Sequence, residues 1–80
     1  MNERVGLDAA TTRMARQRNE IAAAILLVAG GRYPAVLVAN MADAADIAAA
    51  MRGDAASKGV RLILAERADG LGCDVRVTRA

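Results

Sequence analysis

Apolar residues recur at helical spacing in two segments of the chain. In the first, between residues 9 and 29, apolar side chains fall on one face of a helix at about 100° per residue. The residues on this face are Met14, Ile21, Ala24, Ile25 and Val28. We therefore expect a first helix over residues 9–29, packed on the core by this face, with residues 1–8 frayed.

A second, alanine-rich helix is expected over residues 41–52. Asn40 is a good N-cap residue, and Asp43 stands three residues later, where a capping box has an acid. Gly53 interrupts the pattern, so residues 54–58 are expected to form a loose extra turn that Gly59 ends. The side chains expected to face the core are Ala44, Ile47, Ala48, Met51 and Ala55.

Three segments have the composition or the alternation of β-strands. Residues 35–39 are apolar throughout, which predicts a strand covered on both faces or central in a larger sheet. Residues 60–66 form a second expected strand. In residues 73–78 apolar and polar side chains alternate, which predicts one buried and one wet face. The inward residues would be Cys73, Val75 and Val77.

Glycines mark the turns between these segments. Gly30-Gly31 is expected to end the first helix, since one of the pair can adopt the left-handed cap conformation. Residues 67–72 contain Asp-Gly, a strong hairpin signal, so the last two strands are expected to form a C-terminal hairpin.

The order α-β-α-β-β predicts an α+β fold, a two-layer sandwich with both helices on one face of a three-stranded mixed sheet. The first two strands, joined by a helix, would run parallel with a right-handed crossover. The strand order stays open, because the first strand could pair with either strand of the hairpin. Eighty residues are expected to form a single domain, residues 1–80.

Composition limits the core and the possible partners. Tyr33 is the only aromatic residue, so the core consists of small and aliphatic side chains, and association with a partner or a second copy would add burial. The net charge of +2 gives little long-range attraction for a polyanion. Neither a signal peptide nor a membrane-spanning segment is apparent, which predicts a cytoplasmic protein.

Candidate catalytic and cofactor groups have simpler structural explanations. The chain has no His, and Cys73, its one cysteine, falls at an inward strand position, where packing explains it. Asp43 and Asp46 occupy the opening turns of a helix, where the macrodipole favours acids. The glycine pairs precede a strand or lie in a hairpin, so neither aims a helix N-terminus at phosphate. We expect no enzymatic activity, no cofactor and no metal.

The element order over residues 10–79 resembles that of three small families. They are the nucleic-acid-binding domains built around an arginine and histidine pair, the C-terminal domain of a bacterial translation initiation factor, and the sulfur carriers. The first family needs an Arg and a His four residues apart, and the chain has no His. The sulfur carriers have Cys-Pro at a helix start, whereas Cys73 opens the last strand. The resemblance transfers no functional residue.

Two functions follow from this pattern. The first is a small non-enzymatic interaction module that binds a protein partner and can associate with itself. Its candidate interface comprises Leu26, Leu27, Ala45, Ala49 and Gly53, which lie off the predicted core faces. The alternative is a nucleic-acid-binding module that contacts phosphates through arginines. The candidate arginines are Arg13, Arg16, Arg18, Arg61, Arg76 and Arg79.

Overall fold

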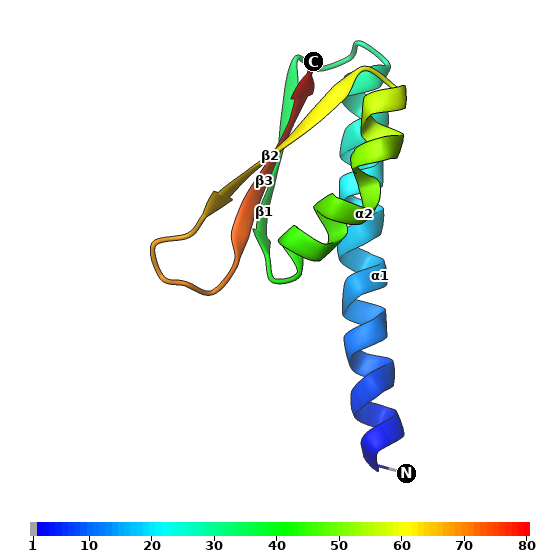
Figure 1. Cartoon of the computed structure of the whole chain (residues 1–80), viewed down its shortest axis with the longest axis vertical. Helices are drawn as coiled ribbons and strands as arrows, with labels where there is room; N and C mark the ends of the chain where they lie inside the picture. Colours follow the sequence, from blue (N-terminus) through cyan, green and yellow to red (C-terminus); the bar gives the residue numbers. More distant parts are fainter. Residues whose placement is uncertain (1) are drawn as a thin grey trace.

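The computed structural model describes residues 2–80 and contains two helices and three strands (Figure 1). Along the chain they are α1 (Asn2–Ala29), β1 (Ala35–Met41), α2 (Ala44–Ser57), β2 (Val60–Glu66) and β3 (Cys73–Arg79). The predicted α+β class and element order are confirmed. Helix α1 begins at Asn2 instead of near residue 9, so it includes residues that the pattern placed in a frayed segment.

The strand order is β1-β3-β2, and both pairs of neighbouring strands are antiparallel. The prediction of a mixed sheet is therefore wrong. Strands β1 and β2 do run in the same direction, since each is antiparallel to β3, but β3 lies between them. The short hairpin fixes β3 beside β2, and β1 pairs with the remaining edge of β3, so no parallel pair of neighbours forms.

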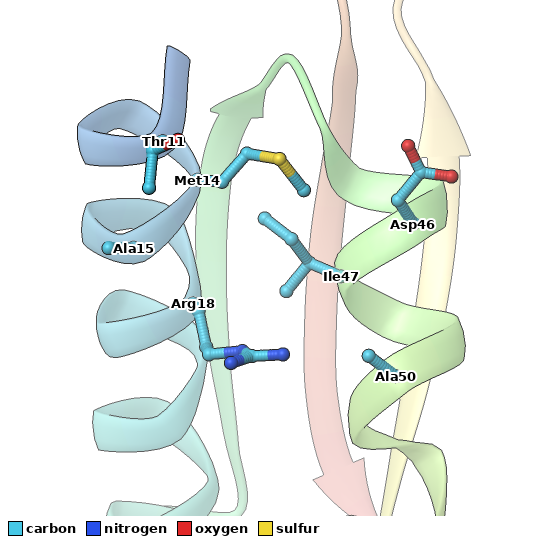
Figure 2. Close-up of a pocket in the computed structure, with 7 residues that line it drawn as sticks. All are labelled: Thr11, Met14, Ala15, Arg18, Asp46, Ile47 and Ala50. Carbon is cyan, nitrogen blue, oxygen red and sulfur yellow. The ribbon is translucent and has the colours of Figure 1, made fainter. Parts of the chain in front are cut away.

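Strand β1 is an edge strand, contrary to the prediction that it is central or covered on both faces. Val36 and Val38 pack against the core, whereas Leu37 between them is 63% exposed. The pairing with β3 is regular from Ala35 to Val38 and then shifts at a bulge before Met41. Both helices lie on the same side of the sheet, which leaves its other face open (Figure 2).

The start of α2 also differs from the prediction. Asn40 is not its N-cap but lies in β1 at the bulge, with a φ of 58° that Asn tolerates better than most residues. The N-cap is Asp43, whose side chain forms no capping hydrogen bond. Helix α2 continues through Gly53 to Ser57, so residues 54–57 belong to the helix instead of to a loose extra turn.

The core lies between the two helices and the inner face of the sheet. All five residues expected on the inner side of α2 are buried, as are Ile21, Ala24, Ile25 and Val28 of α1. In β3, Val75 and Val77 are fully buried and Cys73 is partly buried against the core. Met14 is the exception, because it is 39% exposed.

The predicted turns are confirmed. Helix α1 ends with hydrogen bonds from the Gly30 and Gly31 N–H groups to the carbonyls of Leu26 and Val28. Gly31 has a φ of 76°, the left-handed conformation expected of one residue of the pair. The hairpin loop is closed by the Arg67 N–H, which donates to the carbonyl of Gly72 over 3.0 Å.

Candidate functional site

The open face of the sheet carries the largest exposed apolar side chains of the strands. The pairing register places Leu37 of β1 and Ile63 of β2 on either side of Arg76 of β3, in one row across the three strands. Leu37 is 63% exposed and Ile63 is 43% exposed, and Arg76 between them is also exposed. We call these three residues the central row. Its apolar ends and cationic middle form a surface that no helix covers.

A second arginine lies beside the central row. Arg61 pairs with Thr78 on the open face, so it is the diagonal neighbour of Arg76 on the adjacent strand. Neither Arg61 nor Arg76 forms an ion pair with a described residue. Both guanidinium groups are therefore available for an acidic partner.

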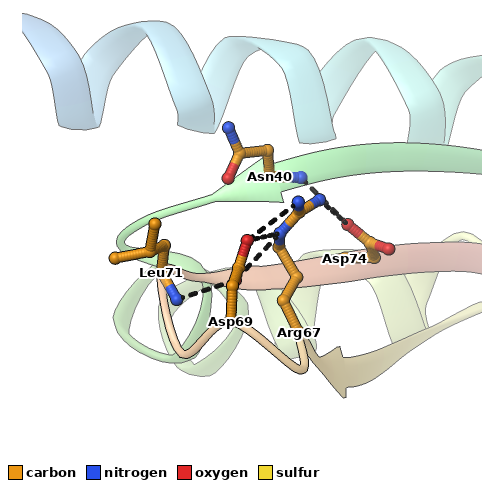
Figure 3. Close-up of polar contacts among 5 residues, drawn as sticks. All are labelled: Asn40, Arg67, Asp69, Leu71 and Asp74. Atoms are coloured by element: carbon orange, nitrogen blue, oxygen red, sulfur yellow. Dashed lines mark hydrogen bonds and ion pairs between the residues drawn. The ribbon is translucent and has the colours of Figure 1, made fainter.

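The hairpin loop borders this face and is fixed by a polar network (Figure 3). The Arg67 guanidinium hydrogen bonds to the Asp69 carboxylate, with its Nη2 3.1 Å from Oδ2, and its Nη1 lies 3.8 Å from Asp74 Oδ1. The same Asp74 oxygen accepts the backbone N–H of Asn40 over 3.0 Å. The Arg67 hydrogen bonds, followed by the N–H of Leu71, lower the pKa of the Asp69 carboxyl below its usual value. The network thus ties the loop to the bulge of β1 and does not form a reactive pair of carboxyl groups.

A groove of about 230 Å³ lies between the first turns of α2 and the middle of α1 (Figure 2). Its apolar floor includes Met14 and Ile47, and Arg18 and Asp46 stand on its opposite sides. This location explains the exposure of Met14, which faces Ile47 at the margin of the core. The groove brings together no set of groups suited to catalysis.

The residues of the predicted protein interface are all exposed but belong to two helices. Ala45, Ala49 and Gly53 form a row along the outward side of α2, as their spacing of four predicted. Leu26 and Leu27 lie on α1, about 100° apart around its axis, so they face different directions. Whether either surface binds a partner stays a prediction.

The predicted basic group on α1 is dispersed. Arg13 forms an ion pair with Asp43, with Nε 2.8 Å from Oδ2, and this hydrogen bond raises the pKa of the guanidinium. Arg18 borders the groove opposite Asp46, and Arg16, two residues earlier, points to another side of the helix. The three arginines therefore do not form one surface.

The predicted arginine cluster on the hairpin forms only in part. Arg61 and Arg76 share the open face, whereas Arg79 lies close to Gly31 at the end of α1. Strand alternation explains the difference, since residues 76 and 79 of one strand point to opposite faces.

Gln17 has a structural role that the sequence pattern did not predict. It is the one buried polar side chain among the described residues, and its Oε1 accepts the backbone N–H of Asp43 over 3.0 Å. This bond supplies from α1 the capping interaction that the Asp43 side chain does not make, because that carboxylate is bound to Arg13. Its position in the sequence could have indicated a buried role, because this polar residue lies within the apolar stripe, three residues after Met14 and four before Ile21.

Among the side chains that the structure describes, no three from His, Cys, Asp or Glu lie close enough together to hold a metal ion. Neither described helix has a stretch long and apolar enough to cross a membrane. Comparisons of the chain with protein-family models, with curated proteins and with solved structures gave no match.

Proposed function

We propose that this chain is a small non-enzymatic module that binds a protein partner through the open face of its sheet. The observation that supports this proposal is the central row, in which Leu37 and Ile63 are exposed on either side of Arg76. A strand whose two faces are both apolar needs cover on both, and the helices cover only one face of β1. A partner on the open face would bury Leu37.

The chemistry of the partner follows from the central row. Complete burial of a Leu or Ile side chain contributes about 1.5–3 kcal/mol, and roughly half of each side chain is still exposed. The two therefore offer about 1.5–3 kcal/mol together, well short of the ~8 kcal/mol of a micromolar complex. Arginine at the centre of an interface often supplies much of the remainder. We thus expect a partner surface with carboxylates between apolar side chains, facing Arg61 and Arg76.

The nucleic-acid alternative has one supporting observation, the two arginines on the open face. With two phosphate contacts, the logarithm of the binding constant would fall with the logarithm of the salt concentration with a slope of about 2. Such binding is weak at physiological salt, and no exposed aromatic residue of the sheet offers a stacking platform. Self-association through Ala45, Ala49 and Gly53 of α2 likewise remains a prediction.

The proposal is tested by purifying the tagged chain from its native cells at physiological salt. Three forms are compared: the wild type, Ile63→Glu on the open face, and Ala49→Arg on the outward side of α2. We expect a protein that is retained by the wild type and by Ala49→Arg and is lost from Ile63→Glu. Circular dichroism of each purified form checks that the substitutions leave the fold intact.

The same preparations separate the alternatives. Co-purified nucleic acid that survives physiological salt would favour the second function over the first. Retention of every bound protein by Ile63→Glu would contradict a docking site on the open face. Loss of the bound protein from Ala49→Arg alone would move the binding site to α2.

A further inference from the structure

The outer edge of β1 has the features of a pairing edge. The inner edge of β1 is hydrogen bonded to β3, whereas the outer edge is paired with no described strand. The strand contains no charged residue and no proline within Ala35–Met41, two of the devices that keep an edge strand from pairing, and its bulge lies beyond Val38. The edge strand β2 at the other side of the sheet carries Arg61 and Glu66.

From this edge we infer that two copies of the chain pair through antiparallel β1 strands, which joins the two sheets into one of six strands. The regular segment Ala35–Val38 ends at the bulge before Met41, and a twofold axis beside Leu37 pairs Val36 of one copy with Val38 of the other. Leu37 of one copy then lies opposite Leu37 of the other. This contact covers the most exposed apolar side chain of β1.

The helical layer fits the same arrangement. Helix α1 packs across β1 and β3, so its axis lies slightly inside the edge of β1. With strands about 4.8 Å apart, two copies joined at β1 place their α1 helices roughly 10 Å apart, at the upper end of the usual 8–10 Å for packed helices. Sheet pairing and helix packing are therefore satisfied by one twofold axis.

The side of α1 that faces this axis follows from the groove. Arg18 borders α2, and Leu27, nine residues later, is about 180° away around the helix. Ala23 and Glu20 lie within about 40° of Leu27. These three residues therefore point past the edge of β1, towards the second copy.

The level of the axis along α1 follows from element lengths. Helix α1 ends and β1 starts at the same end of the molecule (Figure 1). Leu37 lies about 7 Å from the start of β1, and roughly five residues of a helix span that length. Counted back from the end of α1 at Ala29, this distance places the axis beside residues 23–27. Leu27 of one copy then packs beside the small Ala23 of the other.

Charge agrees with this placement. When two antiparallel α1 helices are centred beside residues 23–27, Glu20 of one copy lies level with the end of α1 in the other copy. Arg32 of that other copy lies just beyond this end. Both residues are exposed in the single chain, and no ion pair joins either to a described residue. The two symmetric Glu20 and Arg32 contacts would fix the register of the dimer.

The available area predicts a weak dimer. The chain exposes 5393 Å², and an interface of about a tenth of each copy buries roughly 1,000 Å² in total, at the lower limit for a specific association. Dimerisation should therefore depend on concentration in the micromolar range. The dimer shares Leu37 with the open face but does not rest on the proposed function, because Ala23 and Glu20 lie in the helical layer, away from that face.

The test is sedimentation velocity on the full chain from low micromolar to near-millimolar concentration. Ala23→Arg should raise the dissociation constant at least tenfold. The matched control Ala49→Arg makes the same change at an exposed alanine of α2 and should leave association unchanged. Ile63→Glu should also remain dimeric, which separates this inference from the proposed docking site.

Two further measurements test the register of the dimer and the part of β1 in it. Glu20→Arg and Arg32→Glu should each weaken the dimer, and the double variant should recover most of the loss. Amide hydrogen exchange within residues 35–38 should slow as the concentration rises. A wild type that is monomeric near 1 mM, a dimer lost through Ala49→Arg and not through Ala23→Arg, or unchanged exchange in β1 would overturn the inference.

Discussion

Replacement of Gly53 by alanine tests whether α2 is continuous. Gly53 lies within α2, is exposed, and has no atom within 4 Å of the position that an added β-carbon would occupy. A methyl group at this position therefore meets no neighbour and breaks no contact. Its effect comes from the backbone, since glycine loses more conformational freedom than alanine when it enters a helix.

The expected gain in the free energy of unfolding is about 0.8–1.0 kcal/mol, the difference between glycine and alanine inside a helix. A chain of this length has a total stability of about 4–12 kcal/mol, so the change is measurable. For a domain of this size, each kcal/mol of added stability raises the Tm by roughly 4–8 °C.

The matched control is Gly70→Ala in the hairpin loop. An added β-carbon at Gly70 also meets nothing within 4 Å, but this glycine has a φ of 71°. Alanine in that left-handed conformation should cost about 1–2 kcal/mol. The two substitutions add the same atom to equally open space and differ in the backbone conformation that they require.

Urea denaturation followed by far-ultraviolet circular dichroism, at a concentration low enough to keep the chain monomeric, measures both changes. Opposite signs for Gly53→Ala and Gly70→Ala are the expected result. If Gly53→Ala gave no gain or a loss, the continuity of α2 through Gly53 would be refuted, and the helix would end near Arg52, as the sequence pattern indicated.

Two further predictions concern the polar contacts. Gln17→Ala removes the acceptor of the Asp43 N–H at the start of α2 and should lower the free energy of unfolding by about 1–3 kcal/mol. Urea denaturation measures the change, with Asn19→Ala at an exposed site on the same helix as the control. Equal losses of stability in the two variants would refute the capping role of Gln17. The pKa of the Asp69 carboxyl is lowered below 3.8 in the folded chain, so its contribution is complete above that pH and is lost as the pH falls through the folded pKa. The amide resonance of Leu71 should therefore titrate with a midpoint below the ordinary aspartate pKa of 3.8, and a midpoint at or above it would contradict the hydrogen bonds from Arg67.

Part of the candidate site could be predicted from the sequence because it depends on periodicity alone. The outward row of Ala45, Ala49 and Gly53 follows from helical spacing, and the separation of Val75 and Val77 from Arg76 follows from strand alternation. The central row could not be predicted. It requires the register that places Leu37 and Ile63 beside one residue of β3, and that register is set by pairing between distant segments.

The sequence by itself determined the element order, the inward side of α2 and the turns at Gly31 and in the hairpin, because each depends on residues within a few positions of one another. The tertiary structure decided that β3 lies between β1 and β2, that β1 is an edge, and that Asn40 occupies a bulge. It also decided that Gln17 of α1 caps α2, while the Asp43 side chain forms an ion pair with Arg13. These features depend on contacts between segments more than twenty residues apart, and the spacing of residues along the chain carries no information about which distant group satisfies a given backbone N–H.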